Sequence, residues 1–210
     1  MATLISTKQK QRPTIYRIAS CPTNNAINEI DRFIFHHPLT VALRRNPQYR
    51  ESRPHLDTPA RLRSENLLTG ALAGHQKITV PPYVFEDRGK SMIMIMHLGG
   101  DVCSYSGIVH GGLLATIMDE CLTRCCCPAF EKKVGVTASL NIDYRSPAKA
   151  NSFYVLKADV TEFQGRKAWV KGRIETLPVP GKKTTLIAEA KSLFLEPRET
   201  EGLDGLYKQT

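Results

Sequence analysis

One long helical segment among strand-like segments is the feature that most constrains the fold of this chain. Residues 109–127 open with a glycine pair, continue with a broad apolar stripe and are followed by Pro128, which together predict a single amphipathic helix. Segments with alternating apolar residues lie on both sides of it in the sequence. These segments cover residues 83–86, 90–98, 134–144, 153–163, 167–175 and 184–195. One apolar helix beside many strands predicts an α+β fold, in which a curved, mostly antiparallel sheet wraps around the helix.

The strand predicted at residues 90–98 is apolar on both of its faces. Its three methionines, at positions 92, 94 and 96, alternate with Ile93 and Ile95. Such a pattern is typical of a strand that is buried on both sides. We therefore expect this strand to lie between the helix and a partner subunit.

Composition and spacing divide the 210-residue chain into three parts. Residues 1–63 form a basic N-terminal extension, with short helices over 26–46 and a linker with three prolines over 47–63. Residues 64–198 form the domain that holds the central helix and the strands, and residues 199–210 form a polar tail. This length suits one domain with an extension.

The net charge of +9 belongs mainly to the extension. Residues 1–63 contain 11 Lys/Arg and 4 Asp/Glu, which leaves +7, whereas residues 64–210 contain 18 and 16, which leaves +2. No nucleic-acid-binding motif accompanies the charge, so we predict no nucleic-acid partner. No run of 18 apolar residues occurs, so we predict no membrane span.

The first 28 residues contain four basic residues and no acidic residue. This composition fits a disordered basic tail on a cytoplasmic protein, and it also fits a mitochondrial transit peptide. Pro13 would interrupt an amphipathic helix early, which favours the cytoplasmic interpretation. A mitochondrial location stays open as the alternative.

Cysteines and histidines do not predict a metal centre. Five of the six cysteines fall within residues 103–127, without two ligand pairs at zinc-binding spacing. We expect them to be buried, reduced, apolar side chains. His36, His37 and His55 lie in the extension, where we expect surface or capping positions. We therefore predict neither a metal nor a cofactor.

The sharpest motif stands at the start of the predicted helix. It is His110-Gly111-Gly112, followed after six residues by Asp119. With Gly135-Val-Thr137 and residues 143–148 (DYRSPA) downstream, it resembles the hotdog acyl-thioesterases of the phenylacetate-degradation type. These enzymes belong to the 4-hydroxybenzoyl-CoA thioesterase superfamily. The resemblance covers roughly residues 81–196, and the N-terminal extension is similar to that of fungal members.

The resemblance implies a hotdog fold and hydrolysis of an acyl thioester to a free acid and a thiol. It also implies roles for individual residues. The backbone N–H of Gly111 or Gly112 would polarise the thioester carbonyl, and Asp119 would be the nucleophile or the general base. Thr137 would help to hold the attacking water. Many members carry an asparagine six residues before the histidine, where this chain has Ser104. Ser104 or Ser106 would replace that group only in part.

The chemistry also follows from the residue types. Two glycines at a helix N-terminus expose N–H groups, and the helix dipole adds positive potential, so both favour a developing negative oxygen. Asp119 can accept a proton from water or attack the thioester directly. For His110, a role as helix cap stands beside a role in substrate contact. For Asp119, the alternatives are structural pairing with Arg124, or that Glu120 is the true base.

Helix geometry predicts a dimer. Gly112 and Asp119 are seven residues apart, which is roughly 10 Å along a helix axis. One carbonyl group cannot react at both, so Asp119 must come from a second chain. A two-fold dimer with two shared sites satisfies this requirement. We therefore predict a homodimer, or a tetramer built as a dimer of dimers.

The substrate class stays open between acyl-CoA and an acyl or polyketide chain on a carrier protein. Arg145 and Lys149 follow the strand that contains Thr137, and we expect them to bind the phosphates of CoA. Two other functions remain possible on the same fold. One is a hotdog dehydratase or hydratase, and the other is an acyl-binding protein with weak catalysis.

Overall fold

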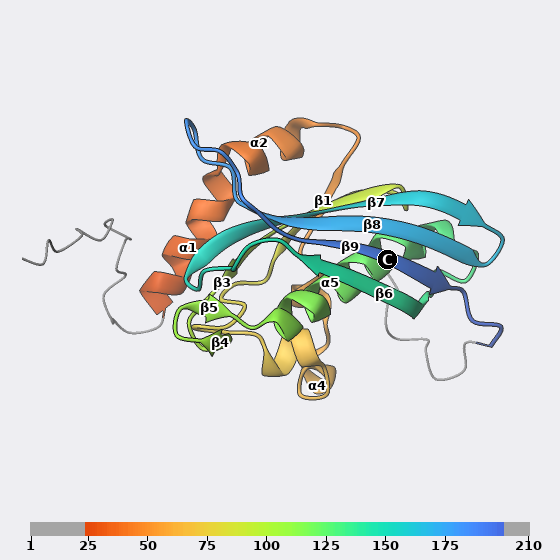
Figure 1. Ribbon diagram of the computed structural model, residues 1–210, viewed down its shortest axis with the longest axis horizontal. Helices are drawn as coiled ribbons and strands as arrows, with labels where there is room; N and C mark the ends of the chain where they lie inside the picture. Colours follow the sequence, from red (N-terminus) through yellow and green to blue (C-terminus); the bar gives the residue numbers. More distant parts are fainter. Residues whose placement is uncertain (1–23, 200–210) are drawn as a thin grey trace, which may run out of the picture.

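The computed structural model describes residues 24–199. Its main element is a seven-stranded antiparallel sheet with the order β1-β2-β3-β7-β8-β9-β6, curved around the long helix α5 (Gly111–Cys126) (Figure 1). The strands are β1 (Arg50–Ser52), β2 (Tyr83–Asp87), β3 (Ser91–Leu98), β6 (Val136–Tyr144), β7 (Ser152–Gln164), β8 (Lys167–Thr176) and β9 (Leu186–Leu195). The predicted α+β hotdog architecture is confirmed.

All six predicted strands are present, with ends that shift by a few residues. The turn between β2 and β3 is closed by a hydrogen bond from the Lys90 N–H to the carbonyl of Asp87 at 2.7 Å. Gly89 has a φ of +79°, and a Cβ there would lie 2.8 Å from the backbone nitrogen of Ala129. Glycine is therefore required at this turn for both conformation and space.

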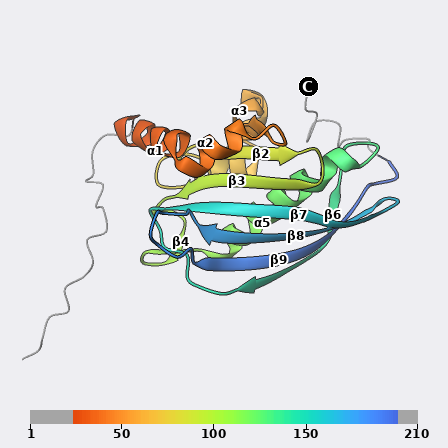
Figure 2. The same ribbon diagram turned by 90° about the horizontal axis from the view of Figure 1, so that it is seen from above.

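Strand β3 is buried on both faces within one chain. Its three methionines pack into the core around α5. On the opposite face, Ile95 packs against Ile30 and Ile34 of α1 (Asn24–His36). Figures 1 and 2 show α1 and α2 (Pro38–Arg45) beside β2 and β3. The expectation that a partner subunit covers this strand was wrong, because the chain's own N-terminal helices cover it.

The two helices predicted at 26–46 are confirmed, whereas the segment predicted as a linker has structure of its own. It contains β1, which pairs with β2 at the edge of the sheet, and the one-turn helices α3 (Pro54–Asp57) and α4 (Ala60–Arg63). The π-helical turn η1 (Leu67–Ala71) follows. A three-residue polar strand among prolines has no alternation to detect, so the sequence pattern did not reveal it.

Two further short strands lead into α5. They are β4 (Cys103–Tyr105) and β5 (Ile108–Val109), which form a separate antiparallel pair. The last residues of α5 and the turn η2 (Cys127–Ala129) hold the cysteine cluster. As predicted, Cys121, Cys125, Cys126 and Cys127 are buried free thiols, while Cys103 is partly exposed.

Within residues 24–199, no cluster of three or more His, Cys, Asp or Glu side chains could hold a metal ion. In the same part of the chain, no helix has the length and apolar character needed to cross a membrane. The basic segment of residues 1–23 and the end of the polar tail, residues 200–210, lie outside the described residues.

Candidate active site

The start of α5 is fixed by His110, which is its N-cap residue. His110 has φ −62° and ψ 130°, and its Nδ1 accepts a hydrogen bond from the N–H of Gly112 at 2.8 Å. The His110 N–H donates to the carbonyl of Val102 at 2.8 Å, which ties the cap to the loop before β4. The structure therefore shows His110 in the capping role. This cap requires that Nδ1 carry no proton.

The two glycines differ in what their amides contact. The Gly112 N–H is engaged by His110, and a Cβ at Gly112 would lie 2.9 Å from the imidazole Nδ1. Among the described residues, no acceptor contacts the Gly111 N–H, although the Gly111 carbonyl accepts a hydrogen bond from Tyr144 Oη at 2.8 Å. Of the two backbone amides predicted to polarise the thioester, only that of Gly111 has no hydrogen-bond acceptor among the described residues, so it is the one available to a substrate.

Asp119 lies two turns further along α5 and contacts Thr137. The Thr137 hydroxyl donates to Asp119 Oδ1 at 2.8 Å. Thr137 is exposed on β6, and Asp119 is partly exposed. The sequence resemblance placed these two side chains in one site, and the structure brings them together. Asp119 keeps its second carboxylate oxygen available for another partner.

A β-bulge on β6 sets which side chains reach α5. Between Thr137 and Ser139 the strand advances by two residues while its partner β9 advances by one, so Ala138 is the extra residue. Side chains alternate along a regular strand, so Thr137 and Tyr144 would otherwise face opposite sides. The bulge turns both toward α5, where Thr137 contacts Asp119 and Tyr144 contacts Gly111.

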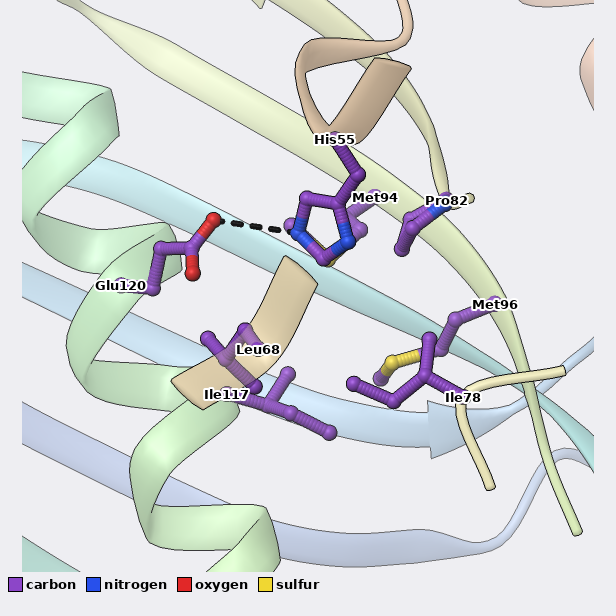
Figure 3. Close-up of a pocket in the computed structure, with 8 residues that line it drawn as sticks. All are labelled: His55, Leu68, Ile78, Pro82, Met94, Met96, Ile117 and Glu120. Atoms are coloured by element: carbon purple, nitrogen blue, oxygen red, sulfur yellow. Dashed lines mark hydrogen bonds and ion pairs between the residues drawn. The ribbon is translucent and has the colours of Figure 1, made fainter. Parts of the chain in front are cut away.

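The neighbouring acid, Glu120, belongs to a different face of α5. Its Oε1 lies 3.2 Å from His55 Nε2 and 3.9 Å from Arg124 Nη2 (Figure 3). Arg124, the residue considered as a structural partner of Asp119, thus forms its helix-spaced pair with Glu120. Glu120 is turned toward the N-terminal extension, so the carboxylate beside Thr137 is that of Asp119.

The histidines of the extension show why surface positions are hard to predict. His36 is exposed, as expected, and His37 caps α2 by accepting a hydrogen bond from the Leu39 N–H at 3.2 Å. His55 was predicted to be a surface or capping residue and is instead 7% exposed. It is buried because α3 inserts it between Glu120 and an apolar pocket (Figure 3).

This pocket lies between α3, η1, β3 and α5, and none of the predicted catalytic residues lines it. Burial leaves His55 Nδ1 without a hydrogen-bond partner among the described residues. The lining residues are His55, Leu68, Ile78, Pro82, Met94, Met96, Ile117 and Glu120. The pocket therefore sits on the Glu120 side of α5 rather than on the Asp119 side.

The predicted substrate-binding residues surround the start of α5. Ser104 and Ser106 are exposed in the β4–β5 hairpin that leads into His110. Lys149 is exposed, and a β-bridge between Ile108 and Lys149 places it beside β5. The guanidinium group of Arg145 instead lies 3.1 Å from each of two carboxylates, those of Asp143 and Glu189. Much of its charge is thus already matched.

The buried thiols of Cys121 and Cys125 on α5 are not reactive nucleophiles. Burial raises the pKa of the Cys121 thiol well above its ordinary value and also raises the pKa of Cys125. A thiol in this state is protonated at neutral pH and is a poor nucleophile. Among the described residues, the exposed or partly exposed motif groups that contact one another on α5 include Asp119 with Thr137 and the His110–Gly111 turn.

Comparison with known proteins identifies the family of this chain. Residues 106–178, which include the motif and the bulge, match the family model of the thioesterase superfamily. An uncharacterised Schizosaccharomyces pombe protein, C26H8.11c, is 34% identical over 162 residues, which cover 76% of this chain and 89% of that protein. This chain belongs to the thioesterase superfamily. The crystal structure of zebrafish thioesterase superfamily member 2 has a TM-score of 0.50 at 21% identity, covers 69% of this chain and 92% of its own, and shows the same fold.

Two further relatives are matched over part of their length. An uncharacterised mitochondrial protein of Candida albicans is 39% identical over 132 residues, 62% of this chain and 59% of that protein. The rat acyl-coenzyme A thioesterase THEM4 is 32% identical over 114 residues, 54% of this chain and 46% of that protein. The chain thus spans about half to three fifths of these two relatives.

Tyr144 is the site residue that the sequence reasoning missed. It stands within the quoted segment 143–148, but nothing in the motif assigned it a role. A signal was available, because Leu140, Ile142 and Tyr144 share one face of β6 and the first two pack against the core. That alternation places Tyr144 on the helix side of the strand.

Proposed function

We propose that this protein hydrolyses acyl thioesters, with the Gly111 amide and the Asp119 carboxylate as its reacting groups. The observation that carries the proposal is the Thr137–Asp119 hydrogen bond, which orients a partly exposed carboxylate on the same helix whose N-terminus presents an unengaged amide. Membership of the thioesterase superfamily and the name of the rat relative support the same reaction.

In this mechanism the Gly111 N–H donates a hydrogen bond to the thioester carbonyl oxygen. The helix dipole strengthens that interaction as negative charge develops. Asp119 either accepts a proton from the attacking water or attacks the carbonyl carbon itself. The C–S bond breaks, and the thiolate leaves and takes up a proton. Attack by water gives the acid directly, whereas attack by Asp119 gives an anhydride with its carboxylate, which water then hydrolyses to release the acid. The Thr137 hydroxyl holds Oδ1, which leaves Oδ2 for the water, and Ser104 or Ser106 supplies a further donor from the hairpin.

The two reacting groups require two chains. Gly111 and Asp119 are eight residues apart on α5, which corresponds to about 12 Å along the axis. We propose a two-fold homodimer, alone or paired into a tetramer, in which each site takes Gly111 from one chain and Asp119 from the other. Strand β6 supports this arrangement, because it is an edge strand, is largely exposed and contacts both groups.

Complementation tests the shared site. Gly111→Pro removes the amide donor while suiting the first position of a helix, and His110 already has the extended conformation that precedes proline. Gly111→Ala keeps the donor and is the matched control, since its Cβ would lie an ordinary 3.5 Å from Tyr144. Co-expression of a Gly111→Pro chain with an Asp119→Asn chain should restore activity that neither homodimer has. Inactive heterodimers of folded chains would show that the two groups do not meet across an interface.

Acyl-CoA is the proposed thioester, with Lys149 and to a lesser degree Arg145 facing its phosphates. The name of the rat relative favours CoA over a carrier protein or a polyketide intermediate. The test is a panel of acyl-CoA chain lengths and of acyl-carrier proteins, with a thiol reagent as the readout. Release of free thiol supports the proposal. An enoyl absorbance change would indicate a dehydratase or hydratase, and no reaction would indicate an acyl-binding protein.

We also propose a mitochondrial location. The Candida relative is mitochondrial by name, and residues 1–28 of this chain are basic and free of acids. A fluorescent protein fused after residue 28 should enter mitochondria, and the same fusion without residues 1–28 should not. An identical cytoplasmic distribution of both fusions would contradict this proposal.

A further inference from the structure

The Gly111–Gly112 peptide, which adjoins the free Gly111 N–H at the Gly111 Cα, is held at both of its polar atoms. On one side, His110 fixes the N–H of Gly112 at 2.8 Å. On the other, Tyr144 Oη donates to the carbonyl of Gly111 at 2.8 Å, and its ring atoms lie 3.5 Å from where a Gly111 Cβ would be. A pair of glycines at a helix start is otherwise the most mobile backbone that a chain can offer. These contacts order Gly111 while leaving its N–H unengaged.

The position of Tyr144 suits a contact that serves function. Its side chain is 53% exposed, so most of the burial that would justify a tyrosine as a core residue is missing. Its hydroxyl donates to the Gly111 carbonyl, which, in the first turn of α5, already accepts a hydrogen bond within the helix. The contact is therefore not needed to satisfy that carbonyl. The same strand holds Asp119 through Thr137, and one bulge at Ala138 brings both contacts onto α5.

We propose that Tyr144 is a positioning residue of the thioester-hydrolysing site, which fixes the direction of the Gly111 N–H toward the substrate carbonyl. This inference rests on the proposed function and deepens it. Strand β6 would then organise both halves of the reaction, Asp119 through Thr137 and the oxyanion donor through Tyr144. The edge strand is thereby a part of the site rather than a support outside it.

The test compares two tyrosines that flank the start of α5. Tyr144→Phe keeps the ring and removes the hydroxyl, whereas Tyr105→Phe removes the hydroxyl of a 79% exposed tyrosine in β4. We expect Tyr144→Phe to lower kcat about 5- to 10-fold with KM within about twofold, because it disturbs a group that acts mainly in the transition state. Its Tm should fall by no more than about 4 °C, the value for one lost hydrogen bond in a domain of this size. Tyr105→Phe should leave both kinetic constants unchanged.

A second measurement separates this proposal from the proposed function. In protein labelled with ¹⁵N-glycine, the Gly111 amide resonance should shift and exchange faster with solvent in Tyr144→Phe than in Tyr105→Phe. If the wild-type protein releases no thiol from any thioester, the proposed function is wrong. The Gly111 resonance would still show whether Tyr144 orders Gly111. Wild-type hydrolysis with an unchanged kcat in Tyr144→Phe, or an unchanged Gly111 resonance, would overturn the positioning role.

Discussion

The two edges of the sheet differ in how completely the chain covers them. At the β1 edge, the extension supplies its own partners, including ion pairs from Arg53 to Asp31 at 2.7 Å and from Arg44 to Glu51 at 2.6 Å. At the β6 edge, most of the nine strand residues are exposed, and Tyr144 is 53% exposed. An exposed edge strand is costly unless something uses it. We infer from this difference that the β1 side contributes mainly to stability and that the β6 side contributes to the proposed reaction.

Helix α5 lies between these two edges, and its two neighbouring acids, Asp119 and Glu120, face different edges. Asp119 contacts a hydroxyl on β6, whereas Glu120 contacts a histidine of the extension. Substitutions on the β6 side should therefore change turnover with little change in stability. Substitutions on the β1 side should do the opposite.

The largest effect should come from Asp119→Asn, which removes the proton acceptor or nucleophile without changing side-chain volume. We expect kcat for thioester hydrolysis to fall by about 100-fold or more while the free energy of unfolding stays nearly unchanged. Glu120→Gln is the matched control and should keep kcat within about threefold. Steady-state thiol release measures both. A larger loss of kcat in Glu120→Gln than in Asp119→Asn would show that Glu120, and not Asp119, is the reacting acid.

On the β1 side, His55→Ala should destabilise the protein rather than inactivate it. It removes the partner of a largely buried carboxylate, so the free energy of unfolding should fall by about 2 kcal/mol, with kcat within about twofold. Urea denaturation gives the stability, and His36→Ala, at an exposed position of α1, should cost less than about 0.5 kcal/mol. Unchanged stability in His55→Ala would mean that the extension is not anchored through this contact.

Thr137→Ala should have a smaller effect on turnover, about 10-fold in kcat, because water can replace a hydroxyl beside Asp119. Thr137→Ser keeps the hydroxyl and should retain most of the activity. The same thiol-release measurement distinguishes them. A loss in Thr137→Ala as large as that in Asp119→Asn would show that orientation of the carboxylate, rather than its presence, limits the reaction.

Sequence periodicity predicted the long elements on both sides of the sheet and missed the short ones, most of them within residues 50–71, for a physical reason. The long strands and α5 bury one regular face each, so their patterns are visible in the sequence. The segment after α2 instead docks through isolated contacts, such as His55 to Glu120, which join residues 65 positions apart. The residues of the motif were recoverable because they are close in sequence. The choice of Gly111 over Gly112 depended on the rotamer of one histidine, which no spacing reveals.

Part of the pH dependence of stability should come from His97 on β3. Burial lowers the pKa of His97 from 6.5 to about 4, and its Nδ1 shares a 2.8 Å hydrogen bond with Thr79. The unfolded chain therefore binds a proton more readily, so the stability that depends on neutral His97 is complete above about pH 6.5 and is lost as the pH falls toward 4. We expect a loss of about 1 kcal/mol between pH 7.5 and 5.5, measured by urea denaturation. In His97→Gln, the free energy of unfolding should change less steeply with pH. If it changes as steeply as in the wild-type protein, another group causes the pH dependence.

The smallest effect should distinguish the two cations beside the β6 edge. Lys149 is exposed next to β5, whereas Arg145 already lies 3.1 Å from both Asp143 and Glu189. Lys149→Ala should therefore raise KM for acyl-CoA about threefold at low salt, and Arg145→Ala should raise it less, because its charge is partly neutralised in the free protein. Raising the salt concentration should remove the difference, since exposed charges are screened within about 10 Å at 0.1 M. If neither substitution nor salt changes KM, the phosphates of CoA do not contact this edge, and a carrier protein, which delivers the thioester through its own surface, becomes the better substrate.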